Sequence, residues 1–223
     1  MEKEVYFELR NNSGDIMTIY RDEPNVVPLS EDWSRTLCKY YTWRYGWDSI
    51  QAHRYPNPSD FIDSLTKRGL TTKIKSEKST LYEIILEVVA HLYKDANIYA
   101  VPLFVTTTQS LGYSPTLEFI AGYVEDEDFV GFAFATRDEI YRWFNTKRIT
   151  KSIEQEILAM VNRELTIYNE YLKGATYHYV INTADGEELD CGSDFYELNG
   201  DTDRMLALML KDSSVYDKSF VEI

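Results

Sequence analysis

The chain has 223 residues, of which 44% are hydrophobic, and its 37 acidic and 23 basic side chains give a net charge of −14. This length is enough to bury a core in one large domain or two small ones, and the apolar content excludes a chain that is disordered by composition. No stretch approaches the about 18 apolar residues of a transmembrane helix, and the N-terminus lacks a secretory-signal pattern, so we expect a cytoplasmic protein without membrane association.

The charge is unevenly distributed. Residues 1–112 hold 13 basic and 15 acidic side chains, whereas residues 113–223 hold 10 and 22. We therefore expect a near-neutral part, 1–112, and a strongly acidic part, 113–223, as one compact unit or two closely packed lobes. A field of this sign repels phosphates, which disfavours direct nucleic-acid binding, and attracts basic protein surfaces. The alternative is that the acidic surface only keeps the protein soluble.

The first elements are a hairpin and a helix. Val5–Leu9 and Ile16–Tyr20 alternate apolar and polar residues around an Asn-Asn-Ser-Gly turn, which predicts a β-hairpin. Ser30, followed by two acids, predicts a helix over Ser30–Tyr41. Aromatic and basic residues mix over 33–54. Base stacking is one interpretation, and packing of the rings with arginines stacked on them is the favoured one, because nearby acids neutralise the patch.

The next segment contains two helices and a strand. A short helix is predicted over Asp60–Arg68, followed by a lysine-rich loop, 71–79, that is either simply exposed or contacts anions. Apolar residues at helical spacing predict a helix over Ser79–Tyr93, with a strand as the alternative because of its β-branched content. Ile98–Thr107 is predicted as a strand, and Pro102 within it favours an edge position or a bulge.

A run of four acids lies between two further predicted strands. Leu117–Val124 and Phe129–Ala135 flank Glu125–Asp128, which lacks the spacing and the glycine of a calcium-binding EF-hand loop. A solvated acidic hairpin tip is the better interpretation. Thr136 with Glu139 then forms a capping box that opens a short helix.

The clearest pattern in the chain is a long amphipathic helix over about 151–173. Ser152 with Gln155 fits a capping box, and Gly174 is suited to end the helix. The segment Ala175–Ile181 then alternates as a strand does. The apolar face of the helix consists of Ile153, Ile157, Met160, Val161, Leu165, Tyr168, Tyr171 and Leu172.

The chain closes with a second hairpin and a helix. Asp185-Gly186 predicts a turn and Glu187–Cys191 the return strand, while Asp201 begins a helix over Arg204–Lys211. Residues after Ser213 are expected to form a short tail. Hairpins mixed with helices, without β-α-β regularity, predict an α+β fold in which a mostly antiparallel sheet packs against the long helix, with shorter helices flanking it.

The sequence contains no recognisable catalytic motif. The three histidines lack the spacing of a metal set, and phosphate loops, dinucleotide fingerprints and nucleophile elbows are absent. We therefore predict no catalytic residues, no metal and no cofactor. Cys38 and Cys191 are expected to be buried free thiols of a reducing compartment. An enzyme site assembled by folding from residues such as His178 and Cys191 is the alternative.

Parts of the second half resemble a known family. Phe129–Phe132, Lys147–Lys151 and Thr166–Gly174, followed by Tyr177–Tyr179, are similar to acidic accessory proteins of phages, prophages and plasmids for which no activity is established. The resemblance covers residues 15–200 in patches. Polar stretches typical of that family are replaced here, at Lys94–Asn97, Glu125–Asp128 and Cys191–Ser193. If they formed an active site, this chain has lost it, and the resemblance implies a diverged member that functions by binding.

The resemblance and the acidity together suggest a function. We expect a phage or mobile-element protein in the bacterial host cytoplasm that binds the basic nucleic-acid-binding surface of a host defence protein, as an anti-CRISPR or antirestriction DNA mimic does. A structural or oligomer-forming accessory protein, and less so an enzyme, are the alternatives. The carboxylates predicted to form the binding surface are Glu125, Asp126, Glu127, Asp128, Glu187, Glu188, Asp190 and Asp194.

Overall fold

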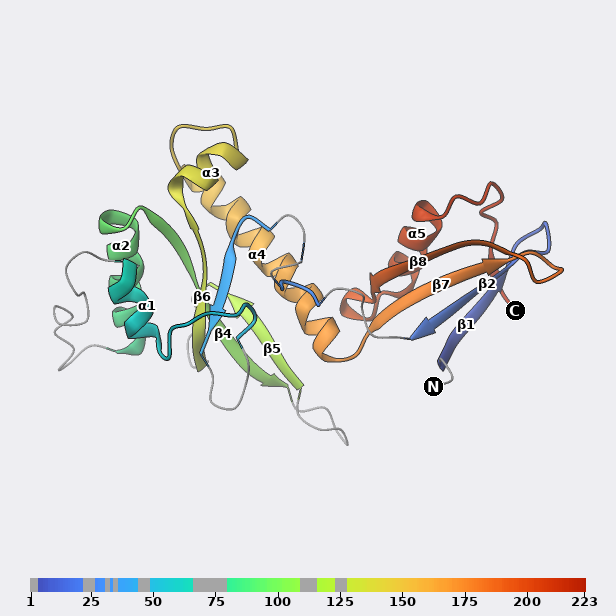
Figure 1. The fold of residues 1–223 in the computed structure, drawn as a ribbon, viewed down its shortest axis with the longest axis horizontal. Helices are drawn as coiled ribbons and strands as arrows, with labels where there is room; N and C mark the ends of the chain where they lie inside the picture. Colours follow the sequence, from blue (N-terminus) through green and yellow to red (C-terminus); the bar gives the residue numbers. More distant parts are fainter. Residues whose placement is uncertain are drawn as a thin grey trace. The chain divides into compact units, whose positions relative to one another are not determined.

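The computed structural model describes residues 4–21, 27–30, 33, 36–43, 49–65, 80–108, 116–122 and 128–223. The chain forms two compact units (Figure 1). The terminal unit combines Met1–Pro28 with Thr166–Ile223, and the central unit is the continuous segment Leu29–Leu165. Each unit contains one antiparallel sheet with helices, so the fold is α+β, as the sequence predicts.

The two units do not follow the division at residue 112 that the charge distribution suggested. Strand β2 (Ile16–Arg21) pairs along its length with β7 (Thr176–Asn182), which joins the first strands to the last third of the chain. Side-chain charge does not determine which strands pair, and a change in composition along the sequence is therefore a poor guide to a unit built from both ends of the chain.

The central unit has a four-stranded sheet in the order β3-β6-β4-β5. Its strands are β3 (Lys39–Thr42), β6 (Asp128–Thr136), β4 (Ile98–Thr108) and β5 (Thr116–Ala121). Strand β4 lies inside the sheet, so the edge position considered for Pro102 is wrong. Pro102 itself pairs in register with Phe132, and the bulge lies one residue farther along, between Leu103 and Phe104, where the extra residue is Val130 of β6.

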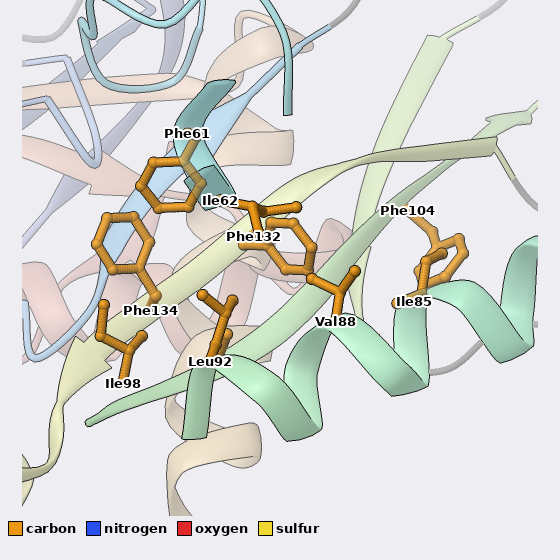
Figure 2. Packing of buried hydrophobic residues seen from close by; sticks show 10 residues of the cluster. Phe61, Ile62, Ile85, Val88, Leu92, Ile98, Phe104, Phe132 and Phe134 are labelled. Carbon is orange, nitrogen blue, oxygen red and sulfur yellow. The ribbon is translucent and has the colours of Figure 1, made fainter. Parts of the chain in front are cut away.

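Helices α1 (Pro58–Leu65) and α2 (Leu81–Asp95) cover one face of this sheet (Figure 1). Figure 2 shows their apolar side chains against the phenylalanines of β6, with Ile62 and Leu92 near Phe132 and Phe134. Tyr41 and its aromatic neighbours pack against the same core, which confirms the packing interpretation for the described aromatics. These neighbours are Trp43 and Tyr55, and Arg54 lies over the ring of Tyr55 at 5.6 Å.

Helix α4 (Lys151–Leu172) lies on the opposite face of the central sheet through its residues up to Leu165 (Figure 1). Ile157, Val161 and Leu165 are buried there. The backbone N–H of Ala121 at the end of β5 donates to Asn162 Oδ1 at 3.0 Å. The short helix α3 (Arg137–Trp143) follows β6 directly and begins with the predicted capping box of Thr136 and Glu139.

The terminal unit has a five-stranded sheet in the order β8-β7-β2-β1-β9, and helix α5 (Thr202–Asp212) packs on one face. The strands not yet described are β8 (Glu188–Tyr196), β1 (Glu4–Arg10) and β9 (Val221–Glu222), and a 3-10 turn spans Leu198–Gly200. Met205 and Met209 of α5 are buried against alternate residues of three strands. The strand residues of this core include Leu9, Met17, Ile19, Tyr177, Tyr179 and Ile181.

Several local predictions are confirmed. Both hairpins form, α2 is a helix and not a strand, and Asp201 caps α5 by accepting from the N–H of Arg204. Gly174 ends α4 in the left-handed conformation with φ +71°. The cap of α4, however, is Thr150, whose hydroxyl accepts from the N–H of Ile153 at 3.4 Å, and not Ser152.

Three local predictions are wrong. Lys39–Thr42 is strand β3 and not part of a helix. It pairs with β6, buries Tyr40 and Thr42 on one face, and its aromatic side chains suit a sheet. Strands β5 and β6 each pair with β4 and not with each other, so these two strands do not form the predicted hairpin. The expected tail contains β9, which pairs with Leu9 and Arg10 of β1. The lysine-rich loop 71–79 lies outside the described residues.

Candidate protein-binding surface

The acid excess belongs mainly to the terminal unit. Its 86 residues contain 7 basic and 18 acidic side chains, a net charge of −11, whereas the 137 residues of the central unit contain 16 and 19, a net charge of −3. The negative charge per residue differs more between the two structural units than between residues 1–112 and 113–223. Charge this dense on a small folded body produces a negative field that extends beyond individual contacts.

Two of the predicted carboxylates stand at the tip of the β7–β8 hairpin. The carbonyl of Thr183 accepts a hydrogen bond from the N–H of Gly186 at 3.0 Å. The N–H of Thr183 donates to the carbonyl of Glu187 at 2.8 Å. This tight turn fixes the start of β8, where Glu188 pairs opposite Asn182. Glu187 and Glu188 are both exposed, so their charges face solvent.

The carboxylate of Asp190 accepts hydrogen bonds from two backbone N–H groups of the terminal unit. Its Oδ2 accepts the backbone N–H of Ser214 at 2.6 Å, and its Oδ1 accepts the N–H of Cys191 at 2.9 Å. The first bond ties β8 to the chain just after α5. We conclude that this carboxylate contributes to the structure as well as to the charge.

Asp194 lies in an irregular part of β8. The register with β7 shifts here, since Tyr177 pairs with Phe195 but Tyr179 pairs with Gly192. Asp194 adopts φ +62°, a left-handed conformation that aspartate tolerates better than most residues. At this bulge the side chain of Asp194 is half-buried and lines a cleft.

The second predicted acidic segment belongs to the central unit. Asp128 is exposed at the start of β6, opposite Val105 of β4. Glu125, Asp126 and Glu127 lie outside the described residues. The eight predicted carboxylates are thus divided between two units, and the four of the terminal unit follow one another along the β7–β8 hairpin.

A cleft of about 380 Å³ opens between β8 and α5 in the terminal unit. Three charged residues, Asp194, Lys211 and Asp212, complete a lining that is otherwise largely apolar. Leu208 is 46% exposed, so the cleft is open to solvent. The remaining lining residues are Ile167, Phe195, Tyr196 and Leu198.

Sequence reasoning missed Asp212 and Glu197. The phenol of Tyr179 donates to Asp212 Oδ2 at 3.5 Å, and burial, with Asp190 and Asp212 nearby, raises the pKa of that phenol. Glu197 accepts from the phenols of Tyr6 and Tyr177, each at 3.2 Å, and from the hydroxyl of Thr202. A signal was available, because tyrosines at alternate positions of β7 need polar partners when their rings are buried.

The two cysteines and His178, the candidates for a site assembled by folding, lie in surroundings that do not resemble a nucleophile pair. Burial, with Glu164 and Glu139 nearby, raises the pKa of the Cys38 thiol, which disfavours the reactive thiolate. Cys191 is a free thiol but is exposed, contrary to the prediction that both thiols are buried. The ring of His178 stacks on Tyr20 with centroids 4.9 Å apart. Among the described residues, no group of three or more His, Cys, Asp or Glu side chains is placed to hold a metal ion.

In the described segments, no helix combines the length and apolar character needed to cross a lipid bilayer. No family model, curated protein or solved structure matches the chain.

Proposed function

We propose that this chain is an acidic accessory protein of a phage or another mobile element that inhibits a host nucleic-acid-targeting defence protein. The terminal unit binds the basic surface with which that protein holds nucleic acid, so that carboxylates take the place of phosphates. The observation that carries the proposal is the net charge of −11 on this unit, against −3 on the larger central unit.

The physical basis is electrostatic complementarity. A groove that binds nucleic acid is lined by lysine and arginine, and a dense negative field accelerates encounter with it and discriminates against acidic partners. Exposed acids such as Glu187 and Glu188 contribute to this field from the hairpin tip. Added salt screens such charges over about 10 Å at 0.1 M, so affinity falls as ionic strength rises.

The experiment is capture followed by competition. A tagged chain captures partners from a bacterial lysate, and each purified partner is then tested for displacement of labelled duplex DNA by the chain. We expect a nucleic-acid-binding protein whose DNA is displaced. The variant Glu187→Gln/Glu188→Gln displaces DNA less well, whereas Glu87→Gln/Glu156→Gln, which removes two exposed acids of the central unit, has little effect.

Two outcomes contradict this proposal. One is that no captured protein binds nucleic acid. The other is that the two doubly neutralised variants displace DNA equally well, since the competition then does not depend on the charge of the terminal unit.

An oligomer-forming accessory role is the second candidate, and the sheet edge favours it. Among the described residues, β9 and the following Ile223 cover the outer edge of β1 at Glu8, Leu9 and Arg10. Val5 and Tyr6, farther along that edge, are 50% and 40% exposed. An open edge can pair with a second copy, and Val5→Lys is expected to prevent such pairing. Sedimentation of the wild-type chain and this variant at several concentrations tests the role.

A further inference from the structure

The cleft between β8 and α5 has an apolar lining, which the negative charge of the terminal unit does not explain. Its lining includes Phe195 and Leu208, although acids surround it on both elements. Leu208 is almost half exposed, while its neighbour Met209 is fully buried in the core of the unit. Several apolar side chains that line one cleft rimmed by charged residues are typical of a place where apolar contact with a partner is favourable.

The dimensions of the cleft favour a single side chain as its occupant. A volume of about 380 Å³ is at the small end of ligand pockets, which enclose most of the surface of their ligands. This cleft leaves Leu208 open to solvent and so does not enclose a free molecule. A side chain presented by a protein surface needs burial on one side only, and aromatic or aliphatic residues commonly act as such anchors.

The charges at the cleft favour a basic neighbour for that anchor. Asp194 and Asp212 contribute two carboxylates against the single ammonium of Lys211. Asp212 is oriented by the phenol of Tyr179, whose ring lies against β8 because residue 192 is glycine. A Cβ at position 192 would come within 2.6 Å of that ring. The carboxylate is therefore positioned before any partner arrives.

We propose that this cleft receives an aromatic or aliphatic side chain of a basic protein segment, with an adjacent arginine or lysine on the carboxylates of Asp194 and Asp212. The inference rests on the proposed function, since it specifies the partner segment that the acidic unit binds. The field of the unit supplies attraction over a distance, and the cleft supplies the contact that selects one basic segment among many.

The probes are two synthetic nine-residue peptides, each with four arginines, that differ only in a central tryptophan or alanine. Their affinities for the full chain are measured by fluorescence anisotropy of a label on the peptide at fixed ionic strength. The tryptophan peptide is expected to bind about tenfold more tightly, as burial of one aromatic side chain predicts.

Two matched variants locate the contact. Leu208→Gln is expected to abolish the preference for tryptophan. Leu189→Gln is the control, because Leu189 lies on β8 and is 45% exposed but does not line the cleft. It is expected to keep the preference, and circular dichroism verifies that both variants are folded. Asp194→Asn/Asp212→Asn weakens both peptides and preserves the ratio of their affinities.

The outcomes separate this inference from the proposed function. Equal affinity for the two peptides, or a preference that survives Leu208→Gln, overturns the cleft as an anchor site, even if both peptides bind in a salt-dependent manner as the proposed function requires. Peptides that bind without salt dependence contradict the electrostatic function itself. Concentration-dependent self-association that Leu208→Gln abolishes assigns the cleft to a second copy of the chain and also overturns the inference.

Discussion

The phenol of Tyr40 on β3 donates a hydrogen bond to the carboxylate of Glu164 on α4, 124 residues farther along the chain. Both groups belong to the central unit, and the Tyr40 side chain is fully buried. Burial raises the pKa of Glu164, and the hydrogen bond from Tyr40 and the charge of Arg163 oppose that effect. The bond thus joins the sheet to the helix through a carboxyl group that the protein interior disfavours in its charged form.

Tyr40→Phe is expected to destabilise the central unit by about 1–2 kcal/mol at neutral pH, because the Glu164 carboxylate loses its donor. All four tryptophans of the chain lie in this unit, so urea unfolding monitored by tryptophan fluorescence measures the effect. The double variant Tyr40→Phe/Glu164→Gln completes a cycle. Additive single effects would contradict an interaction between the two side chains.

Glu164→Gln is expected to change the pH dependence of stability. A folded-state pKa above the ordinary value of 4.5 means that the folded protein binds the Glu164 proton more tightly than the unfolded chain does. The resulting stabilisation is complete below that ordinary pKa and is lost as pH rises through the folded-state pKa. Wild type should therefore match the variant near pH 4 and lose stability relative to it at higher pH. Urea unfolding across this range tests the sign, and a difference that does not vary with pH refutes the prediction.

Asp190→Ala is expected to loosen the end of α5, whereas Glu188→Ala is not. The first change removes the acceptor of the Ser214 N–H and costs about 1–3 kcal/mol, and the second removes an exposed charge of the same strand. Thermal unfolding followed by circular dichroism and hydrogen exchange at residues 210–214 measure both effects. Equal protection in the two variants would show that Asp190 contributes only charge.

Gly131→Ala is expected to destabilise the central unit by about 3 kcal/mol, through overpacking against backbone atoms that cannot move aside. A Cβ at position 131 would lie 2.1 Å from the carbonyl oxygen of Tyr41 on the neighbouring strand β3. The backbone of β3 would have to separate from β6 to accommodate it. A urea midpoint equal to that of wild type would mean that this pair of strands is not held as closely as the structure has it.

The helices could be predicted from the sequence because their signals are local. The spacing of apolar residues in α2 and α4, and capping pairs such as Thr136 with Glu139, lie within a few residues of one another. Strand β3 could not be predicted in this way. Tyr40 is buried towards α4 and Tyr41 is half-buried against the core of α1 and α2, so two consecutive aromatic residues replace the apolar-polar alternation that identifies a strand in a sequence.

The candidate site was predictable only in part. The exposed acids Glu187 and Glu188 follow a recognisable turn and could be located. The roles of Asp190 and Asp194 depend on a hydrogen bond to Ser214 and on a bulge, and neither has a local signal. For the cleft, one indication existed. Helix α5 is apolar on more of its circumference than its buried residues Met205 and Met209 require, which leaves Leu208 outside the core.

The assembly of the terminal unit from both ends of the chain has a consequence during synthesis. The hairpin of β1 and β2 leaves the ribosome before the 137 residues of the central unit, and its partner β7 only after them. At about 5–20 residues per second, the hairpin waits on the order of ten seconds with both edges unpaired, since β9 as well as β7 is still to be made. The central unit can fold in that interval, since its segment is continuous. Translation therefore imposes an order on folding, in which the acidic unit is completed last.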